Sequence, residues 1–245
     1  MRMRKKKHLE ERLEACAPVM LVMQNQNEHA NDPLDDSLFF DSIKVFGNNN
    51  PLHLEVGCGK GSFILELARR NPDINYVAVE KTPNVLVTGA EALMESDIKN
   101  VRFCLGQAEY LEHLFRPHTV ERLYLNFSCP FPKETYARHR LTHTRFLEIY
   151  KAVMKPGSEI HQKTDNMRLF EFSIEHFSKN GFAVKNVSLD LHNSGFEGNI
   201  MTEYEKRFTD LGQPIYRLEA VVPESFMGTS KNRCEKQKWA GCARF

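Results

Sequence analysis

A loop with three glycines in five residues follows the first strongly β-type run of the chain. The run is LHLEV (52–56), and the loop GCGKG after it contains Gly57, Gly59 and Gly61 before a helical pattern begins. Glycines at this place let the backbone approach a ligand closely, at the carboxyl edge of a sheet where α/β proteins bind cofactors. A phosphate-binding loop would need Ser or Thr after Lys60, and a dinucleotide loop would need G-x-G-x-x-G, so the loop satisfies neither pattern.

Two carboxylates accompany the glycine loop. Glu55 lies two residues before Gly57, and Glu80 ends the next β-type run, NYVAVE (75–80). A carboxylate at the end of that strand accepts hydrogen bonds from both hydroxyls of a ribose, which NAD and S-adenosylmethionine share. Glu55 is placed to reach an ammonium group, although a solvated strand end is the alternative role for Glu80. The shorter glycine spacing favours S-adenosylmethionine, so a methyltransferase is the leading interpretation and a nicotinamide dehydrogenase the weaker one.

A second group of polar residues follows the apolar run LYLNF (123–127). There the sequence continues SCPFPK, which places Cys129 between a serine and the first of two prolines. A strand that stops abruptly at small polar residues held by prolines is typical of a binding loop.

Further acids lie in KTDN (163–166) and TEYE (202–205). Asp165 has the position of a helix N-cap, and Thr202 with Glu205 has the spacing of a capping box. On spacing alone, capping is the better explanation for Thr202 and Glu205, whereas for Asp165 a capping role is compatible with ligand binding. The histidines His143 and His161 are predicted to be a helix-start residue and a strand residue rather than ligands.

Short β-type runs alternate with helical patterns from residue 51 onward. The predicted strands are 52–56, 75–80, 101–105, 121–127, 158–163, 182–188 and 214–220. The predicted helices are 62–70, 84–95, 108–115, 143–154, 167–180 and 202–211. This alternation predicts an α/β fold, a mostly parallel seven-stranded sheet with helices on both faces. Residues 1–50 form an N-terminal basic arm and appendage, 51–220 the main domain, and 221–245 a basic tail.

The composition is that of an ordinary globular protein of 245 residues, with 41% hydrophobic and 27% charged residues. Its six cysteines form no paired framework, which favours a reducing cytoplasm. Cys234 and Cys242 are near neighbours but have no histidine pair beside them, so we expect no metal site. The apolar run 15–23 is too short to span a bilayer, and no small-residue cleavage site follows it, so we expect neither export nor membrane insertion.

The net charge is only +1, but the charges are grouped. Residues 1–7 carry five positive charges and no acid, 133–145 carry four against one acid, and 231–245 carry five against one. Each block alone is typical of solvated surface. Three in one chain, with Tyr136 and His139 interleaved in the middle one, favour a polyanionic partner.

The segments LHLEVGCGKGSFILELARRNPDINYVAVE, LYLNFSCPFPK, EIHQKTDN and MTEYEKRF…GQPIYRLEA together resemble the bacterial tRNA (guanine-N7-)-methyltransferase family. The similarity runs from the basic start to about Ala220, with the motifs in family order. The combination of NFS-x-P-x-PK, KTDN and TEYE is far more specific than the glycine loop. The resemblance implies a class I, Rossmann-like methyltransferase fold, S-adenosylmethionine as methyl donor, tRNA as partner, and a variable-loop guanine as acceptor.

The resemblance also implies roles for individual residues. The cofactor positions of the family match Glu55, Glu80, Gln107 and Cys129, beside the glycine loop. The RNA-substrate positions match Lys133, Asp165, Thr202, Glu203, Tyr204 and Glu205, and the basic residues Arg138 and Arg140 fall where the family contacts RNA. The catalytic candidates are therefore Cys129, Asp165 and Glu205. The sequence leaves open whether the protein is a monomer or a homodimer.

Two of these positions depart from the family pattern. Gln107 stands where the family usually has an acid, and an amide oxygen still accepts a hydrogen bond, without charge assistance. Cys129 stands where the family usually has a catalytic Asp, and a neutral thiol is a weak donor and acceptor. We expect an active enzyme, because guanine N7 needs no base to remove a proton before attack. A catalytically impaired tRNA-binding paralogue is the alternative.

Overall fold

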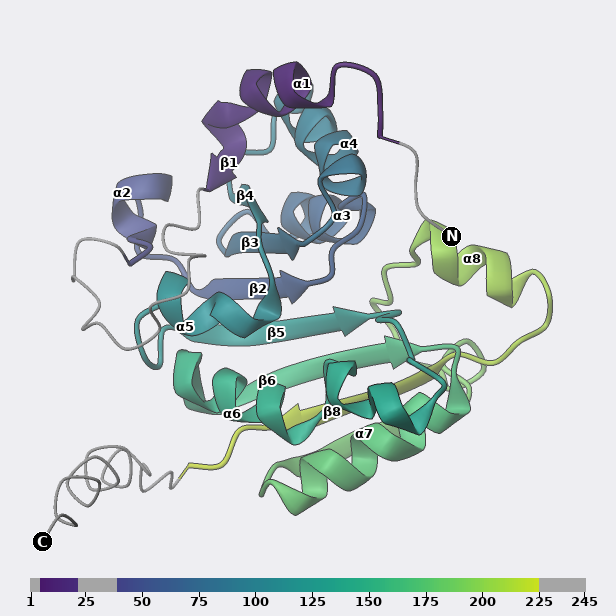
Figure 1. The fold of residues 1–245 in the computed structure, drawn as a ribbon. Coiled ribbons are helices and arrows are strands. Elements are labelled where there is room, and N and C mark those ends of the chain that lie inside the picture. Colours follow the sequence, from purple (N-terminus) through teal and green to yellow (C-terminus); the bar gives the residue numbers. More distant parts are fainter. Residues whose placement is uncertain (1–4, 22–38, 225–245) are drawn as a thin grey trace, which may run out of the picture.

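The computed structural model describes residues 5–21 and 39–224, which form an α/β structure around one sheet (Figure 1). The strands are β1 (Met20–Leu21), β2 (Leu52–Val56), β3 (Asn75–Glu80), β4 (Val101–Leu105), β5 (Val120–Asn126), β6 (Met154–Thr164), β7 (Ala183–Ser188) and β8 (Tyr216–Val221). Their order is β1-β4-β3-β2-β5-β6-β8-β7. β8 lies antiparallel between β6 and β7, and the other neighbouring pairs are parallel. The predicted fold class is therefore confirmed.

The sheet contains eight strands rather than the predicted seven. The extra strand is β1, which pairs with the edge strand β4 through Met20 opposite Phe103 and Leu21 opposite Cys104. Two residues are too few to show a strand pattern, so this pairing was not visible in the sequence. Because β1 belongs to the N-terminal segment, part of that segment is built into the sheet.

Helices cover both faces of the sheet (Figure 1). The helices are α1 (Leu9–Ala15), α2 (Ser42–Phe46), α3 (Ser62–Arg70), α4 (Pro83–Met94), α5 (Leu111–Leu114), α6 (Thr144–Val153), α7 (Met167–Lys179) and α8 (Glu203–Thr209). Short 3-10 turns are η1 (Ala17–Val19), η3 (Ala108–Tyr110) and η4 (Glu134–His139). α3 and α4 pack on one face, and α5, α6 and α7 on the other. In the described parts of the chain, no helix is long and apolar enough to cross a membrane.

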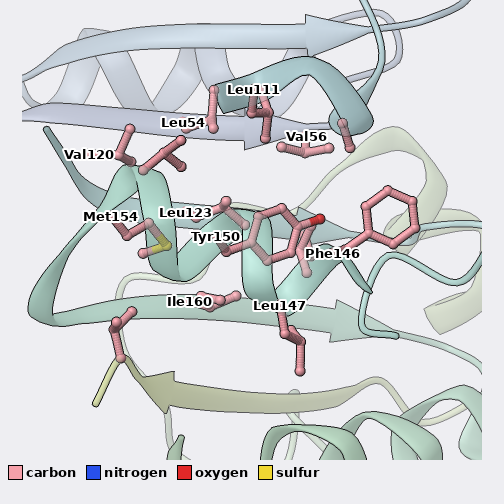
Figure 2. Close-up of a cluster of buried hydrophobic side chains, with 14 of the residues drawn as sticks. Leu54, Val56, Leu111, Val120, Leu123, Phe146, Leu147, Tyr150, Met154 and Ile160 are labelled. Carbon is pink, nitrogen blue, oxygen red and sulfur yellow. The ribbon is translucent and has the colours of Figure 1, made fainter. Parts of the chain in front are cut away.

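Strand residues that alternate in direction build two hydrophobic clusters. Leu54 and Val56 of β2 point toward α5 and α6, where Phe146, Leu147 and Tyr150 form a buried stripe of α6 (Figure 2). On the other face, the side chains of β3 and β4 pack against α3 and α4. Each Å² of buried apolar surface stabilises the fold by about 25 cal/mol. This packing keeps the strand ends in fixed positions.

The N-terminal helix α1 is attached to α4. The Arg12 guanidinium donates two hydrogen bonds to the Glu91 carboxylate, at 2.6 and 2.7 Å. The Lys6 backbone N–H donates to the Asn84 side chain at 2.9 Å, and Leu9 is buried. The basic residues at 1–4 and the segment 225–245, with Cys234 and Cys242, lie outside the described residues.

The N-cap residues of α6 and α8 are those predicted from the sequence, whereas the N-cap of α7 differs. His143 caps α6 by accepting the Arg145 N–H, and Thr202 with Glu205 forms the predicted capping box of α8. The cap of α7, however, is Asn166, which accepts the Leu169 N–H at 2.9 Å. Asp165 is therefore not the helix cap.

Candidate active site

A cleft of about 410 Å³ opens at the carboxyl edge of the sheet. It lies where the neighbouring strands β2 and β5 end. After β2 the chain continues to β3 on one side, and after β5 it continues to β6 on the other side. Such a switch in strand order is where open α/β sheets bind ligands. The residues that line the cleft come from the glycine loop, the start of α3 and α4, the end of β5, and α8: Glu55, Gly57, Cys58, Gly59, Lys60, Ser62, Phe63, Val85, Asn126, Phe127, Thr202, Tyr204 and Arg207.

The glycine loop needs its glycines for two reasons. Gly57, Gly59 and Gly61 have φ angles of 80°, 59° and 75°, in the left-handed region that glycine tolerates. At Gly61 there is also no room, because a Cβ atom would lie 2.5 Å from the Phe103 ring. The loop therefore keeps its backbone close to the sheet and open toward the cleft.

Glu55 is buried at the floor of the cleft, with only 2% of its surface exposed. Its Oε1 accepts a hydrogen bond from the Asn126 side chain at 3.0 Å, whereas Oε2 is buried and has no hydrogen-bond partner among the described residues. Burial raises the pKa of this carboxyl from the ordinary 4.5 to about 7. A buried acceptor without a donor is costly, and this oxygen can accept a hydrogen bond from a ligand that brings a donor or a positive charge.

Glu80 joins the glycine loop to the start of α4. One oxygen accepts the Gly59 N–H at 3.2 Å, and the other accepts the Thr82 N–H at 2.8 Å. A carboxylate has about four lone-pair sites, so both oxygens retain capacity for a ligand hydroxyl. Two backbone N–H groups thus fix the carboxylate of Glu80 at the end of β3, where the sequence placed it.

The loop that follows β5 brings Cys129 to the surface. Cys129 is a free, exposed thiol. Phe127 and Phe131 have φ angles of 50° and 41°, which are unusual for bulky residues and show that the loop is held in a specific shape. The Phe127 N–H donates to the Lys163 carbonyl at 2.8 Å, which ties this loop to β6.

Arg140 binds backbone carbonyls of the same loop. It is 5% exposed, and its guanidinium donates to the Pro130 carbonyl at 3.0 Å, to the Phe131 carbonyl at 3.0 and 3.3 Å, and to Glu134 at 2.7 Å. It also lies 4.5 Å from the centre of the Phe172 ring. Arg140 was expected at the RNA surface, but its N–H donors are directed toward the loop.

A buried ion pair connects the KTDN and TEYE segments. Lys163 Nζ donates to Glu205 Oε2 at 2.7 Å, to the Ile200 carbonyl at 2.8 Å and to Asn199 at 3.0 Å. Glu205 is fully buried and also contacts His192 at 3.1 Å and the Asn199 side chain at 2.7 Å. Burial lowers the pKa of Lys163, and the Glu205 charge opposes that effect. Both Glu205 oxygens have protein partners, so a substrate contact by Glu205 stays a prediction.

Tyr204 lines the cleft, and Asp165 lies in the short connection between β6 and α7. Asp165 is partly exposed and makes no hydrogen bond or ion pair within residues 5–21 and 39–224. Tyr204 is 46% exposed, and its ring centre lies 5.1 Å from that of Phe127. Burial raises the pKa of Tyr204, with a further contribution from Asp165 and Cys129, so these three side chains share one electrostatic environment.

The other predicted site residues do not line the cleft. Gln107, Lys133 and Arg138 are exposed, and Gln107 follows the end of β4. Glu203 begins α8, and its side chain lies outside the described residues. Sequence reasoning missed Asn126 as the partner of Glu55, and it missed Asn199 and His192 as partners of Glu205. Asn126 and Glu55 are 71 residues apart, and no helix or strand period connects Asn199 or His192 with Glu205.

A separate charged group lies on β5, β6, β7 and β8, among residues that do not line the cleft. His161 contacts Glu159 at 2.9 Å and Glu219 at 3.9 Å, and this trio has the residue types of a metal site. Arg122 and Lys185 pair with Glu159, however, at 2.9 and 2.7 Å, and Arg217 pairs with Glu219. The cluster is thus an ion-pair network in which protein cations already neutralise both carboxylates.

The cleft suits the groups that S-adenosylmethionine presents. The unpartnered Glu55 oxygen matches an ammonium group, and Glu80 matches ribose hydroxyls. The glycine loop leaves room for the chain of atoms between those two groups. These carboxylate acceptors therefore fit the cofactor expected from the sequence.

Comparison with known proteins gives a consistent result. Residues 49–218 match the protein family described as "Putative methyltransferase". The tRNA (guanine-N(7)-)-methyltransferase of Bacillus subtilis (strain 168) is 52% identical over 175 residues, which cover 71% of this chain and 82% of that protein. The protein of the same name from Listeria monocytogenes serotype 4a (strain HCC23) is 49% identical over 177 residues, which cover 72% and 83%.

Solved structures share the fold at low sequence identity. The 16S rRNA methyltransferase KamB superposes with a TM-score of 0.57 at 16% identity, over 78% of this chain and 95% of that one. The 16S rRNA (adenine(1408)-N(1))-methyltransferase of Catenulisporales acidiphilia, solved with its cosubstrate SAM, gives 0.55 at 14% identity, over 77% and 92%. These likenesses confirm the Rossmann-like methyltransferase fold.

Proposed function

Because the chain belongs to the tRNA (guanine-N7-)-methyltransferase family, we propose that it transfers a methyl group from S-adenosylmethionine to N7 of a guanine in the variable loop of tRNA. The observation that carries this proposal is the cleft in which the unpartnered Glu55, the glycine loop and the TEYE segment meet. A cytoplasmic location, and the choice between monomer and homodimer, stay predictions.

The proposed reaction requires no proton transfer by the protein before attack. Guanine N7 carries a free lone pair, so no general base has to remove a proton before attack. Bound S-adenosylmethionine supplies an electrophilic methyl group on a sulfonium. The side chains have to orient the base, exclude water and stabilise the positive charge that develops on the purine.

On this proposal the floor of the cleft holds the methyl donor. Glu55 pairs with the ammonium group, Glu80 accepts from the ribose hydroxyls, and Gln107 accepts from the adenine amino group. Support comes from the buried free oxygen of Glu55 and from the two backbone contacts that fix Glu80.

The mouth of the cleft receives the base. Asp165 accepts hydrogen bonds from the donors on the guanine Watson–Crick edge, and Tyr204 and Thr202 border the base. Support comes from the partial exposure of Asp165 and from its lack of a partner in the described chain. The exposed Lys133 and Arg138 contact the RNA backbone, whereas Glu205 and Arg140 act by positioning α8 and the loop after β5.

Replacement of Cys129 by aspartate is expected to change kcat by less than about tenfold. The reaction has no proton to remove, and Asp165 already supplies a carboxylate near Tyr204. Single-turnover methyl transfer measures the effect, with Cys129→Ser as the neutral control. A gain of orders of magnitude would mean that the natural enzyme is impaired at this position, as in the alternative of a tRNA-binding paralogue.

Arg140→Lys is expected to lower kcat about tenfold while the Kd for tRNA stays within twofold. A lysine keeps the charge, so a phosphate contact would survive, but it cannot reproduce the guanidinium fork that holds the Pro130 and Phe131 carbonyls. The exposed Arg138 offers the matched control, because Arg138→Lys should leave kcat unchanged. Equal behaviour of the two variants would show that Arg140 does not position the loop.

The proposed reaction is tested with two transcripts of one tRNA. One contains guanosine, and the other contains 7-deazaguanosine throughout, which lacks N7. Labelled methyl groups should enter only the first transcript, whereas both should bind the protein. Equal labelling would show that the acceptor atom is not N7.

A further inference from the structure

The helix α8 stands beside the carboxyl ends of β5 and β6 and is held there by its inner side (Figure 1). Thr202 and Glu205 form its capping box, and the buried Glu205 carboxylate binds Lys163 of β6 at 2.7 Å. Near the other end of the helix, the Thr209 hydroxyl contacts the His192 ring at 3.1 Å. Because the inner side is fixed at both ends, the outer side keeps a defined position relative to the cleft.

The outer side of α8 carries aromatic and basic residues. Tyr204 is 46% exposed, and Phe208 is partly exposed. These two residues are four positions apart in the helix, and their ring centres lie 4.6 Å apart. Lys206 and Arg207, between them in the sequence, are exposed. Aromatic rings interleaved with cations are typical of surfaces that bind single-stranded nucleic acid.

Arg207 is the cation of this helix that faces the cleft. It lines the cleft together with Thr202 and Tyr204, whereas Lys206 and Phe208 do not. Burial raises the pKa of Tyr204, and the positive charge of Arg207 partly opposes that rise, so the two side chains are close together. The Arg207 guanidinium makes no hydrogen bond or ion pair with another described residue. Its N–H donors are therefore available to an anionic group of a ligand.

A guanosine within an RNA chain brings such a group to this place. Enzymes that modify a base take it out of the stack, so a guanine in the cleft carries the phosphates on either side of it to the cleft entrance. An arginine binds a phosphate through two parallel hydrogen bonds. The neighbouring base then lies outside the cleft, where the Tyr204 and Phe208 rings offer it a surface.

We propose that α8 binds the nucleotide next to the acceptor guanosine. Arg207 pairs with the phosphate that joins the two nucleotides, and the Tyr204–Phe208 ring pair stacks on the neighbouring base. The inference rests on the proposed function and adds a second nucleotide to its site. Stacking accepts any base, so this subsite positions the RNA without reading its sequence. Arg207 takes no part in the bond changes and serves to hold N7 in line with the methyl group.

The first test removes the charge from either partner of the phosphate contact. Two tRNAs are prepared in which the phosphate on one or the other side of the acceptor guanosine is a neutral methylphosphonate. The wild-type protein should bind one of them roughly tenfold more weakly than unmodified tRNA. Arg207→Gln should show a similar loss with unmodified tRNA and no further loss with that modified tRNA. Losses that multiply, or a wild-type protein indifferent to both modifications, would overturn the inference.

Lys206→Gln is the matched control, because it removes the same charge from the same helix at a position that does not line the cleft. Arg207→Gln should lower single-turnover kcat about tenfold and reduce the slope of log Kd for tRNA against log salt by about one. Lys206→Gln should keep kcat. An equal loss of kcat in both variants would show a general attraction of RNA to α8 and would overturn the specific contact.

The stacking surface is tested with an abasic nucleotide beside the acceptor, on the side that the methylphosphonates identify. Phe208→Leu keeps an apolar side chain but removes the ring. The wild-type protein should bind the abasic tRNA at least fivefold more weakly than unmodified tRNA, whereas Phe208→Leu should distinguish the two by less than twofold. Equal discrimination by both proteins would show that the base does not stack on this helix.

Two small ligands separate the RNA phosphate from the carboxylate of the methyl donor. S-adenosylhomocysteine has that carboxylate, and 5′-methylthioadenosine has the adenosine but no amino acid. Arg207→Gln should keep both affinities within twofold, and weaker binding of S-adenosylhomocysteine alone would assign Arg207 to the cofactor and overturn the inference. A wild-type protein that binds tRNA but transfers no methyl group would contradict the proposed function. The phosphate test measures binding and would still decide the role of Arg207.

Discussion

Glu55→Gln is expected to weaken S-adenosylmethionine binding about 30- to 150-fold at pH 8. The substitution keeps the shape and the contact with Asn126 but removes the charge that faces the ammonium group. A hydrogen bond between charged groups contributes about 2–3 kcal/mol, which corresponds to that range of affinities. Calorimetric titration measures the change, and a loss of less than threefold would show that the ammonium does not lie at Glu55.

The same carboxyl makes methyl-donor binding depend on pH. Burial raises its pKa to about 7, so the free protein binds a proton there below pH 7, and the ammonium ligand requires the ionised form. Affinity is therefore highest above pH 7 and falls as the pH drops. We expect roughly tenfold weaker binding at pH 6 than at pH 8. Glu55→Gln should bind equally at both values, and 5′-methylthioadenosine should show no such dependence with either protein.

Lys163→Met is expected to lower the free energy of unfolding by about 3–5 kcal/mol. Both members of the Lys163–Glu205 pair are buried, and removal of the lysine leaves the Glu205 carboxylate without its cation. Urea denaturation measures the loss. The pair joins β6 to α8, whose start lines the cleft. We therefore expect kcat/KM to fall as well, and the affinity for S-adenosylmethionine to fall less.

The double variant Lys163→Met with Glu205→Gln separates charge from packing. A neutral pair leaves no unpaired charge in the interior, so at least half of the lost stability should return. Equal stability of the single and double variants would indicate that shape, and not the buried charge, controls this contact. A loss below about 1 kcal/mol in Lys163→Met would contradict the ion-pair account altogether.

The regular part of the fold was predictable because the patterns that define it are local. The seven main strands and the buried stripe of α6 follow from period-2 and period-3.6 patterns within short windows. The capping box at Thr202 and Glu205 was also readable, because both residues belong to one turn. The two-residue strand β1 was not, since its pairing with β4 spans more than 80 residues.

The contents of the site were predictable, but not the direction of each side chain. Residue type and family position indicated Glu55 and Glu80 as site residues; Glu55 lines the cleft, and Glu80 accepts the N–H of Gly59 in the loop that lines it. Charge grouping could not show that Arg140 turns inward beneath its loop. Nor could spacing show which residue caps α7, because Asp165 and Asn166 are adjacent and both residue types favour that position.

The most direct test of the central claim is methyl transfer followed by mapping. The wild-type protein is incubated with S-adenosylmethionine and an unmodified tRNA transcript, and the RNA is then reduced and treated with aniline, which cleaves at N7-methylated guanine. We expect cleavage at a single guanine of the variable loop. An uncleaved tRNA from a protein that binds both tRNA and S-adenosylhomocysteine would contradict the claim and make the chain a tRNA-binding protein whose Cys129 has replaced an essential acid.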